Sequence, residues 1–166
     1  MKNVFLMFAL CAFQAECFAS SAILDLKRIA TESEAGKDIE KQIEKLNQDA
    51  SKDLEELESQ IKLLDSKKKK SAEDSRKIEE LQVLLYDMVR TKKYQITEAY
   101  KKAVAIVDRE MKKIIEKICK KDRYKVVINS DAIVYATQEC KDITGDVISE
   151  LNRHCKEVKV EITEQK

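Results

Sequence analysis

The sequence predicts an α+β protein that is predominantly helical, with a small β body and a long antiparallel coiled-coil helical hairpin that projects from it. Three observations predict this class. Residues 37–121 contain neither glycine nor proline. Apolar residues within them recur at steps of three and four, and short β-branched runs lie on both sides. The arm is therefore expected to interrupt a body formed by residues 20–36 and 122–166.

The arm is expected to consist of two helices with a tip near residues 67–71. If they are antiparallel, facing residue numbers add up to a constant, and apolar residues pair in this way at a sum of 142. Lys92, opposite Ala50, is the one polar residue in this register. The outgoing helix is acidic and the returning helix is basic, which favours the pairing, although exposed ion pairs contribute only about 0 to 1 kcal/mol each. The apolar pairs are 39 with 103, 43 with 99, 46 with 96, 54 with 88, 57 with 85, 61 with 81 and 64 with 78.

Residues 1–19 have the pattern of a cleaved secretory signal peptide. Lys2 precedes an apolar run from Val4 to Phe13, and the small residues Cys17 and Ala19 come just before the expected cleavage site. An uncleaved membrane anchor is the alternative, but the apolar run is short for a span. We therefore expect the mature chain to be exported.

The N-terminal part of the body is predicted to begin with a strand at Ser21–Leu26 and to continue through the first helical turns at Lys27–Ala35. Ser33, Ala35 and Gly36 offer a capping and turning site before the arm.

The C-terminal part is predicted to contain a β-hairpin of Tyr124–Ile128 and Ala132–Ala136, followed by a short helix with Thr144 as its N-cap. The alternating tail, Glu157–Ile162, is expected to add an edge strand.

Two kinds of side chain on the arm are candidates for contacts with partners. Lysines at the tip and on the lower part of the second helix suit anionic lipid headgroups or an acidic partner, although charge runs are usually only solvated. An apolar fringe beside the seam suits packing on the body or on a neighbouring subunit, or the capture of unfolded apolar segments. The candidates are Lys67, Lys68, Lys69, Lys70, Lys112, Lys113 and Lys117 for the basic set, and Tyr86, Val89, Tyr100 and Val104 for the fringe.

Composition excludes several classes of function. The formal net charge of +1 argues against a dedicated nucleic-acid binder. All four phenylalanines lie in the first eighteen residues, so the remaining core is thin and favours oligomerisation. The sequence has no glycine-rich phosphate loop, and His154 is its only histidine. We therefore expect no enzymatic activity, no cofactor and no metal site.

The chain resembles the Skp/OmpH family of periplasmic chaperones. The resemblance spans essentially the whole mature chain and depends on the order of parts, because no single motif is chemically specific. It implies a homotrimer in which a central β body carries three helical arms. It also implies a periplasmic location and a function as an ATP-independent holdase that binds unfolded outer-membrane proteins and prevents their aggregation. The matching residues are Ile23–Asp25, Glu32–Lys37, Tyr124–Ile128, Ile133–Ala136 and Asp142–Ile148.

A secreted coiled-coil protein that binds a specific folded partner, as a structural or adhesin-like component of the envelope, is the alternative function. Broad binding of unfolded barrel proteins favours the holdase, whereas a stoichiometric folded partner favours the alternative.

Three cysteines remain after removal of the signal peptide, and their pairing is left open. Cys140 and Cys155 bracket the short helix, and in an oxidising compartment they are candidates for a disulfide, with Cys119 free or bonded between subunits. Three reduced thiols are the alternative, because geometry decides which cysteines pair.

Overall fold

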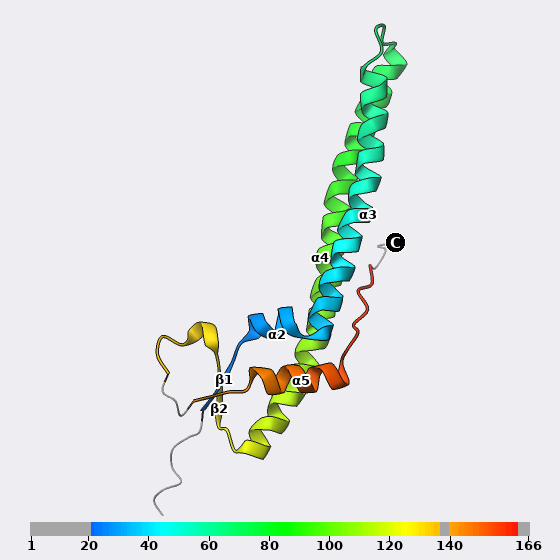
Figure 1. The fold of residues 1–166 in the computed structure, drawn as a ribbon. Coiled ribbons are helices and arrows are strands. Elements are labelled where there is room, and N and C mark those ends of the chain that lie inside the picture. Colours follow the sequence, from blue (N-terminus) through cyan, green and yellow to red (C-terminus); the bar gives the residue numbers. More distant parts are fainter. Residues whose placement is uncertain (1–20, 137–139, 163–166) are drawn as a thin grey trace, which may run out of the picture.

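A computed structural model describes residues 21–136 and 140–162, in which a long helical arm rises from a small body (Figure 1). The fold is predominantly helical, as the sequence predicts. The signal peptide predicted at residues 1–19 lies outside the described residues. The elements in chain order are β1 (Ser21–Leu24), α2 (Leu26–Glu32), α3 (Glu34–Asp65), α4 (Ala72–Asp122), β2 (Val126–Asn129), the short 3₁₀ helix η1 (Ser130–Ala132), β3 (Lys141–Asp142) and α5 (Thr144–His154).

The arm is built from α3 and the N-terminal half of α4, which are joined by residues 66–71 and lie side by side (Figure 1). Ala50 and Leu57 of α3 and Ile96 and Ala99 of α4 are buried, although most of the arm surface is exposed. Lys92 is tolerated beside this seam because its ammonium group extends to the Asp53 carboxylate of α3, 2.9 Å away.

Side-chain caps fix where the two long helices begin. The buried Ser33 hydroxyl accepts a hydrogen bond from the Gly36 amide at 3.1 Å and so starts α3. Ser71 and Asp74 form a reciprocal capping box that starts α4. Arg123, with φ of 59°, ends α4 in the left-handed conformation.

Asp25 changes where the first strand ends. Its carboxylate accepts a hydrogen bond from the Arg28 amide at 2.9 Å, so α2 begins at Leu26 and β1 ends at Leu24. The predicted strand is therefore two residues too long at its C-terminal end.

The three strands form one small sheet in the order β2-β1-β3, and β2 and β3 both run parallel to β1. Ser21 is opposite Val126, and Ile23 is opposite Asp142. The prediction of a β-hairpin over residues 124–136 is wrong. The chain turns through η1 after β2, and residues 133–136 form no strand in the structure. Parallel pairing is available to β2 because the entire arm serves as the connection between β1 and β2.

Thr144 does not cap α5, although it is the first residue of that helix. Its hydroxyl instead accepts a hydrogen bond from the Asp25 amide at 2.9 Å, and its own amide donates to the Asp142 carboxylate at 2.8 Å. The predicted N-cap is wrong because this buried hydroxyl joins the end of β1 to the start of α5.

The tail does not join the sheet either. Residues 157–162 are extended but form no strand, and they run beside the arm (Figure 1). The prediction of an edge strand is wrong because the tail amides at Val158 and Val160 find their acceptors on side chains of α3.

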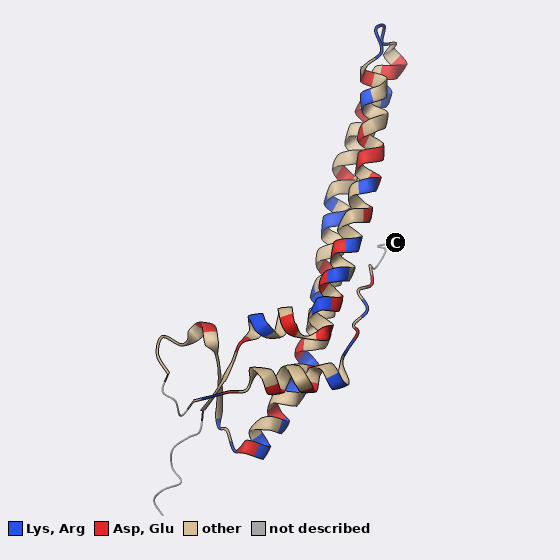
Figure 2. Ribbon diagram, viewed as in Figure 1, with Lys and Arg blue, Asp and Glu red and all other residues tan. Residues whose placement is uncertain are grey.

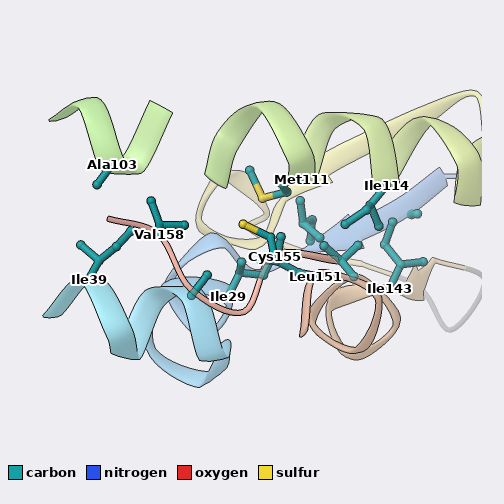
Figure 3. Packing of buried hydrophobic residues seen from close by; sticks show 13 residues of the cluster. Ile29, Ile39, Ala103, Met111, Ile114, Ile143, Leu151, Cys155 and Val158 are labelled. Carbon is teal, nitrogen blue, oxygen red and sulfur yellow. The ribbon is translucent and has the colours of Figure 1, made fainter. Parts of the chain in front are cut away.

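The hydrophobic core lies where the sheet, α2, the lower parts of α3 and α4, α5 and the tail meet (Figure 3). It is small, and it contains no aromatic side chain among its fully buried members. Its buried residues are Ala22, Leu24, Ile29, Ala35, Ile39, Ala103, Met111, Ile114, Ile143, Val147, Leu151, Cys155 and Val158.

Cys119, Cys140 and Cys155 are all free thiols. Cys140 precedes α5 and Cys155 follows it, and neither takes part in a disulfide in the structure. Burial raises the pKa of Cys155, with a smaller contribution from Glu110.

Candidate functional site

An apolar groove of about 450 Å³ opens where α2 crosses the lower part of the arm. Its walls come from three helices, and its apolar surface is left uncovered by the described residues of this chain. Glu40 and Asp108 are the acidic residues among its lining. The apolar lining residues are Leu26, Ile29, Ala30, Ile39, Ile43, Tyr100, Val104, Val107 and Met111.

A second hollow of about 540 Å³ adjoins the first and extends further along the arm. The two share Ile43 of α3 and Tyr100 of α4, so they form one apolar track, which we call the arm groove. Lys92 and Lys93 add positive charge to its upper part. The other residues of this part are Asn47, Ala50, Ser51, Leu54, Val89, Ile96 and Thr97.

The structure brings most of the predicted fringe together in this groove. Val89, Tyr100 and Val104 line it. Tyr86 lies one helical turn beyond Val89 and is 73% exposed, outside the lining itself. Tyr100 remains 49% exposed although it lines both hollows. The arm groove therefore presents exposed apolar and aromatic side chains on the lower part of the arm.

The tip lysines are partly neutralised by neighbouring acids. Lys67 pairs with Asp74, and Lys70 pairs with Asp65. Hydrogen bonds from Lys67 and from Ser71 lower the pKa of Asp74 to about 2. Lys68 and Lys69 are exposed, and no ion pair within the described ranges 21–136 and 140–162 engages either one. The tip loop is the blue segment at the end of the arm in Figure 2.

The lower basic residues lie far from the tip. The 40 residues from Ala72 to Lys112 correspond to roughly 60 Å of helix, so the two basic sets do not form one surface. Lys112 is exposed, whereas Lys113 pairs with Glu110 at 2.7 Å and lowers the pKa of that carboxyl group. Lys117 lies in a cleft between α4 and α5.

The arm and the tail are joined by a contact that the sequence does not predict. Asp38 and Gln42, which are four residues apart on α3, bind the main chain of Val158 and Val160. The signal was present in two places, as a polar pair beside the seam and as alternation in the tail. Neither pattern indicates that one segment is the partner of the other.

The part of the chain that the structure describes contains no helix that is both long and apolar enough to span a membrane. Within the same residues, no three side chains of His, Cys, Asp or Glu gather into a group that could hold a metal ion.

Comparisons with known proteins agree with this arrangement. A family model described as "Outer membrane protein (OmpH-like)" matches residues 20–151. Among solved structures, a candidate outer membrane chaperone (OmpH-like) from Caulobacter crescentus CB15 is similar, with a TM-score of 0.66 and 19% identity, over 89% of this chain and 92% of that one. At this identity the likeness concerns the fold. The comparison with curated proteins gives no significant match.

Proposed function

This chain belongs to the OmpH-like family of outer membrane proteins, and from that premise we propose that it is an ATP-independent holdase chaperone. Its clients are unfolded outer-membrane proteins, which it binds in the periplasm and keeps from aggregating on their way to the outer membrane. The arm groove is the observation that carries the proposal. It presents apolar side chains along an arm that is only two helices thick.

Unfolded barrel proteins present a particular problem of recognition. Their strands alternate apolar and polar residues, and their unpaired edges aggregate in water. A holder of many such chains cannot depend on one sequence. A shallow apolar groove with an exposed tyrosine, Tyr100, and lysines at its upper part offers many weak contacts, which add up when one client touches several arms.

The proposal includes a homotrimer with three arms around a shared cavity. The number three comes from the family resemblance. The need for a partner subunit is supported by Val134 and Tyr135, which are almost wholly exposed. It is also supported by Val126 and Ile128 of β2, whose side chains are partly exposed. Such β-branched and aromatic surface beside a sheet edge is expected to be covered by another subunit.

The basic residues have a supporting role in this account. Lys68 and Lys69 at the tip and Lys112 near the body attract acidic clients or an anionic lipid surface and increase the rate of encounter. Their contribution should weaken with salt, since the Debye length falls from about 10 Å at 0.1 M to about 3 Å at 1 M.

Light scattering tests the proposal. A urea-unfolded outer-membrane barrel protein is diluted into buffer with and without the purified mature chain, in the absence of nucleotide. We expect scattering to be suppressed at about one oligomer per client. Unchanged scattering from a folded, helical sample would refute the holdase function.

A further inference from the structure

The tail after α5 is bound to α3 in the way that one strand binds the edge of another. The Val158 amide donates to Asp38 Oδ2 at 3.1 Å, and the Val160 amide donates to Gln42 Oε1 at 3.0 Å. Gln42 Nε2 completes the set by donating to the Val158 carbonyl at 2.9 Å. In an extended chain these three main-chain groups point to the same side. Two side chains of a helix therefore take the place of a neighbouring strand.

On the tail, these hydrogen bonds involve only main-chain atoms, so they do not depend on which side chains the bound segment carries. Asp38 and Gln42 also hydrogen-bond to each other at 2.8 Å, which holds the two side chains in a fixed relative position. The largest side-chain contact comes from Val158, which is 3% exposed and packs between Ile39 and Ala103 (Figure 3). Val160 is partly buried against the same core. Lys159 and Glu161 point away and are exposed.

The ligand class follows from this geometry. The site accepts an extended segment with an apolar residue at every second position, and it places one of these residues in the seam between α3 and α4. The tail supplies Val158, Val160 and Ile162 in that pattern. A strand of an unfolded membrane barrel has the same alternation.

We propose that Asp38 and Gln42 form a second peptide site on the arm, which the chain's own tail occupies until a client strand displaces it. This inference rests on the proposed holdase function and adds a place of binding and a means of regulation. The tail lies after residue 151, where the family match ends.

The attached tail also determines how much of a competing peptide is needed to occupy the Asp38 and Gln42 site. Because it is joined directly to α5, it competes at a high effective concentration, which is in the millimolar range for short tethers. A short peptide therefore displaces it only when added at a comparable, millimolar concentration. A long client that is already bound in the arm groove is held near the site too, so its effective concentration there is also high. The site therefore favours extended chains that bind at several places.

Amide hydrogen exchange in the full mature chain tests the displacement. The probe is a ten-residue peptide in which valine alternates with threonine, added at concentrations that saturate its binding by fluorescence anisotropy. We expect exchange at the Val158 and Val160 amides to rise at least tenfold. A peptide N-methylated on alternate residues lacks the N–H groups that would donate to Asp38 and Gln42. It should leave exchange at the Val158 and Val160 amides unchanged.

Two pairs of variants provide matched controls. Asp38→Ala and Gln42→Ala should each raise tail exchange without peptide and weaken peptide binding at least fivefold. Glu44→Ala and Gln48→Ala alter a similar pair four residues apart on α3, hydrogen-bonded at 3.3 Å, which does not touch the tail. These controls should behave as the unmodified chain does.

The outcomes separate this inference from the proposed function. If scattering is suppressed but the tail amides stay protected with bound peptide, the second site is refuted and the holdase stands. Equal binding of the plain and N-methylated peptides would also refute it. If neither the barrel protein nor the peptide binds, both proposals fail together.

Discussion

The backbone of Gly36 lies so close to Ala30 that a β-carbon on Gly36 would be 1.9 Å from the Ala30 carbonyl oxygen. Backbone cannot yield as a flexible side chain can, so Gly36→Ala must move α2 away from the start of α3. We expect the free energy of unfolding to fall by about 1–3 kcal/mol or more, as measured by urea denaturation.

The second glycine provides the control. A β-carbon at Gly145, in the first turn of α5, meets nothing within 4 Å. Gly145→Ala should therefore leave stability unchanged or raise it by up to about 1 kcal/mol. Equal losses from both substitutions would contradict the close approach at Gly36.

The tip offers a titration that can be observed directly. The pKa of Asp74 is lowered to about 2, first by Lys67 and then by Ser71. Lys67→Met should raise this pKa towards the ordinary value of 3.8, although the Ser71 hydrogen bonds keep it below that value. Lys68→Met is the control and should leave it unchanged. Carbon-detected NMR of the Asp74 carboxyl group distinguishes the two results.

Asp142 should make the stability of the body sensitive to acid. Hydrogen bonds from Thr144 lower its pKa below the ordinary value of 3.8, and Arg28 adds a smaller contribution. A lowered pKa in the folded state stabilises the protein above the unfolded pKa, and this stabilisation is lost as pH falls through the folded value. Between about pH 5 and pH 2, Asp142→Asn should therefore lose less stability than the unmodified chain. Parallel curves from urea denaturation at each pH would contradict this.

The buried tail valine should matter for folding as well as for regulation. Val158→Ala removes apolar surface from the core, and we expect a loss of about 1–3 kcal/mol. Lys159→Ala changes an exposed neighbour and should stay within about 0.5 kcal/mol of the unmodified chain. If thermal denaturation shows no difference between the two variants, Val158 is not part of the core.

The arm was the easiest part to predict, because its spacing of apolar residues is a local signal that extends over many turns. Ser33 caps α3, as the sequence predicts, but Ala35 and Gly36 lie inside the first turn of that helix and not before it. The exact pairing of the seam at a sum of 142 stays a prediction, although the contact of Lys92 with Asp53 lies within one turn of it.

The body was harder because its partners are distant in the sequence. β2 looks the same whether it pairs with a following strand or with β1, about a hundred residues earlier, and only the parallel register at Ser21 and Val126 decides. Thr144 lies at the start of a helix, where the sequence predicts an N-cap, but its hydroxyl accepts a hydrogen bond from the Asp25 amide instead. The tail alternates as a strand does, but Asp38 and Gln42 provide its acceptors.

Photo-crosslinking from two tyrosine positions tests the central claim most directly. A benzophenone amino acid is placed at Tyr100, which lines the arm groove, or at Tyr94, which is also about half exposed but is not part of its lining. Each variant is irradiated with an unfolded outer-membrane barrel protein bound. We expect strong crosslinking at Tyr100 and little at Tyr94. Equal crosslinking at both positions, or crosslinking at Tyr94 alone, would contradict the arm groove as the place where clients bind.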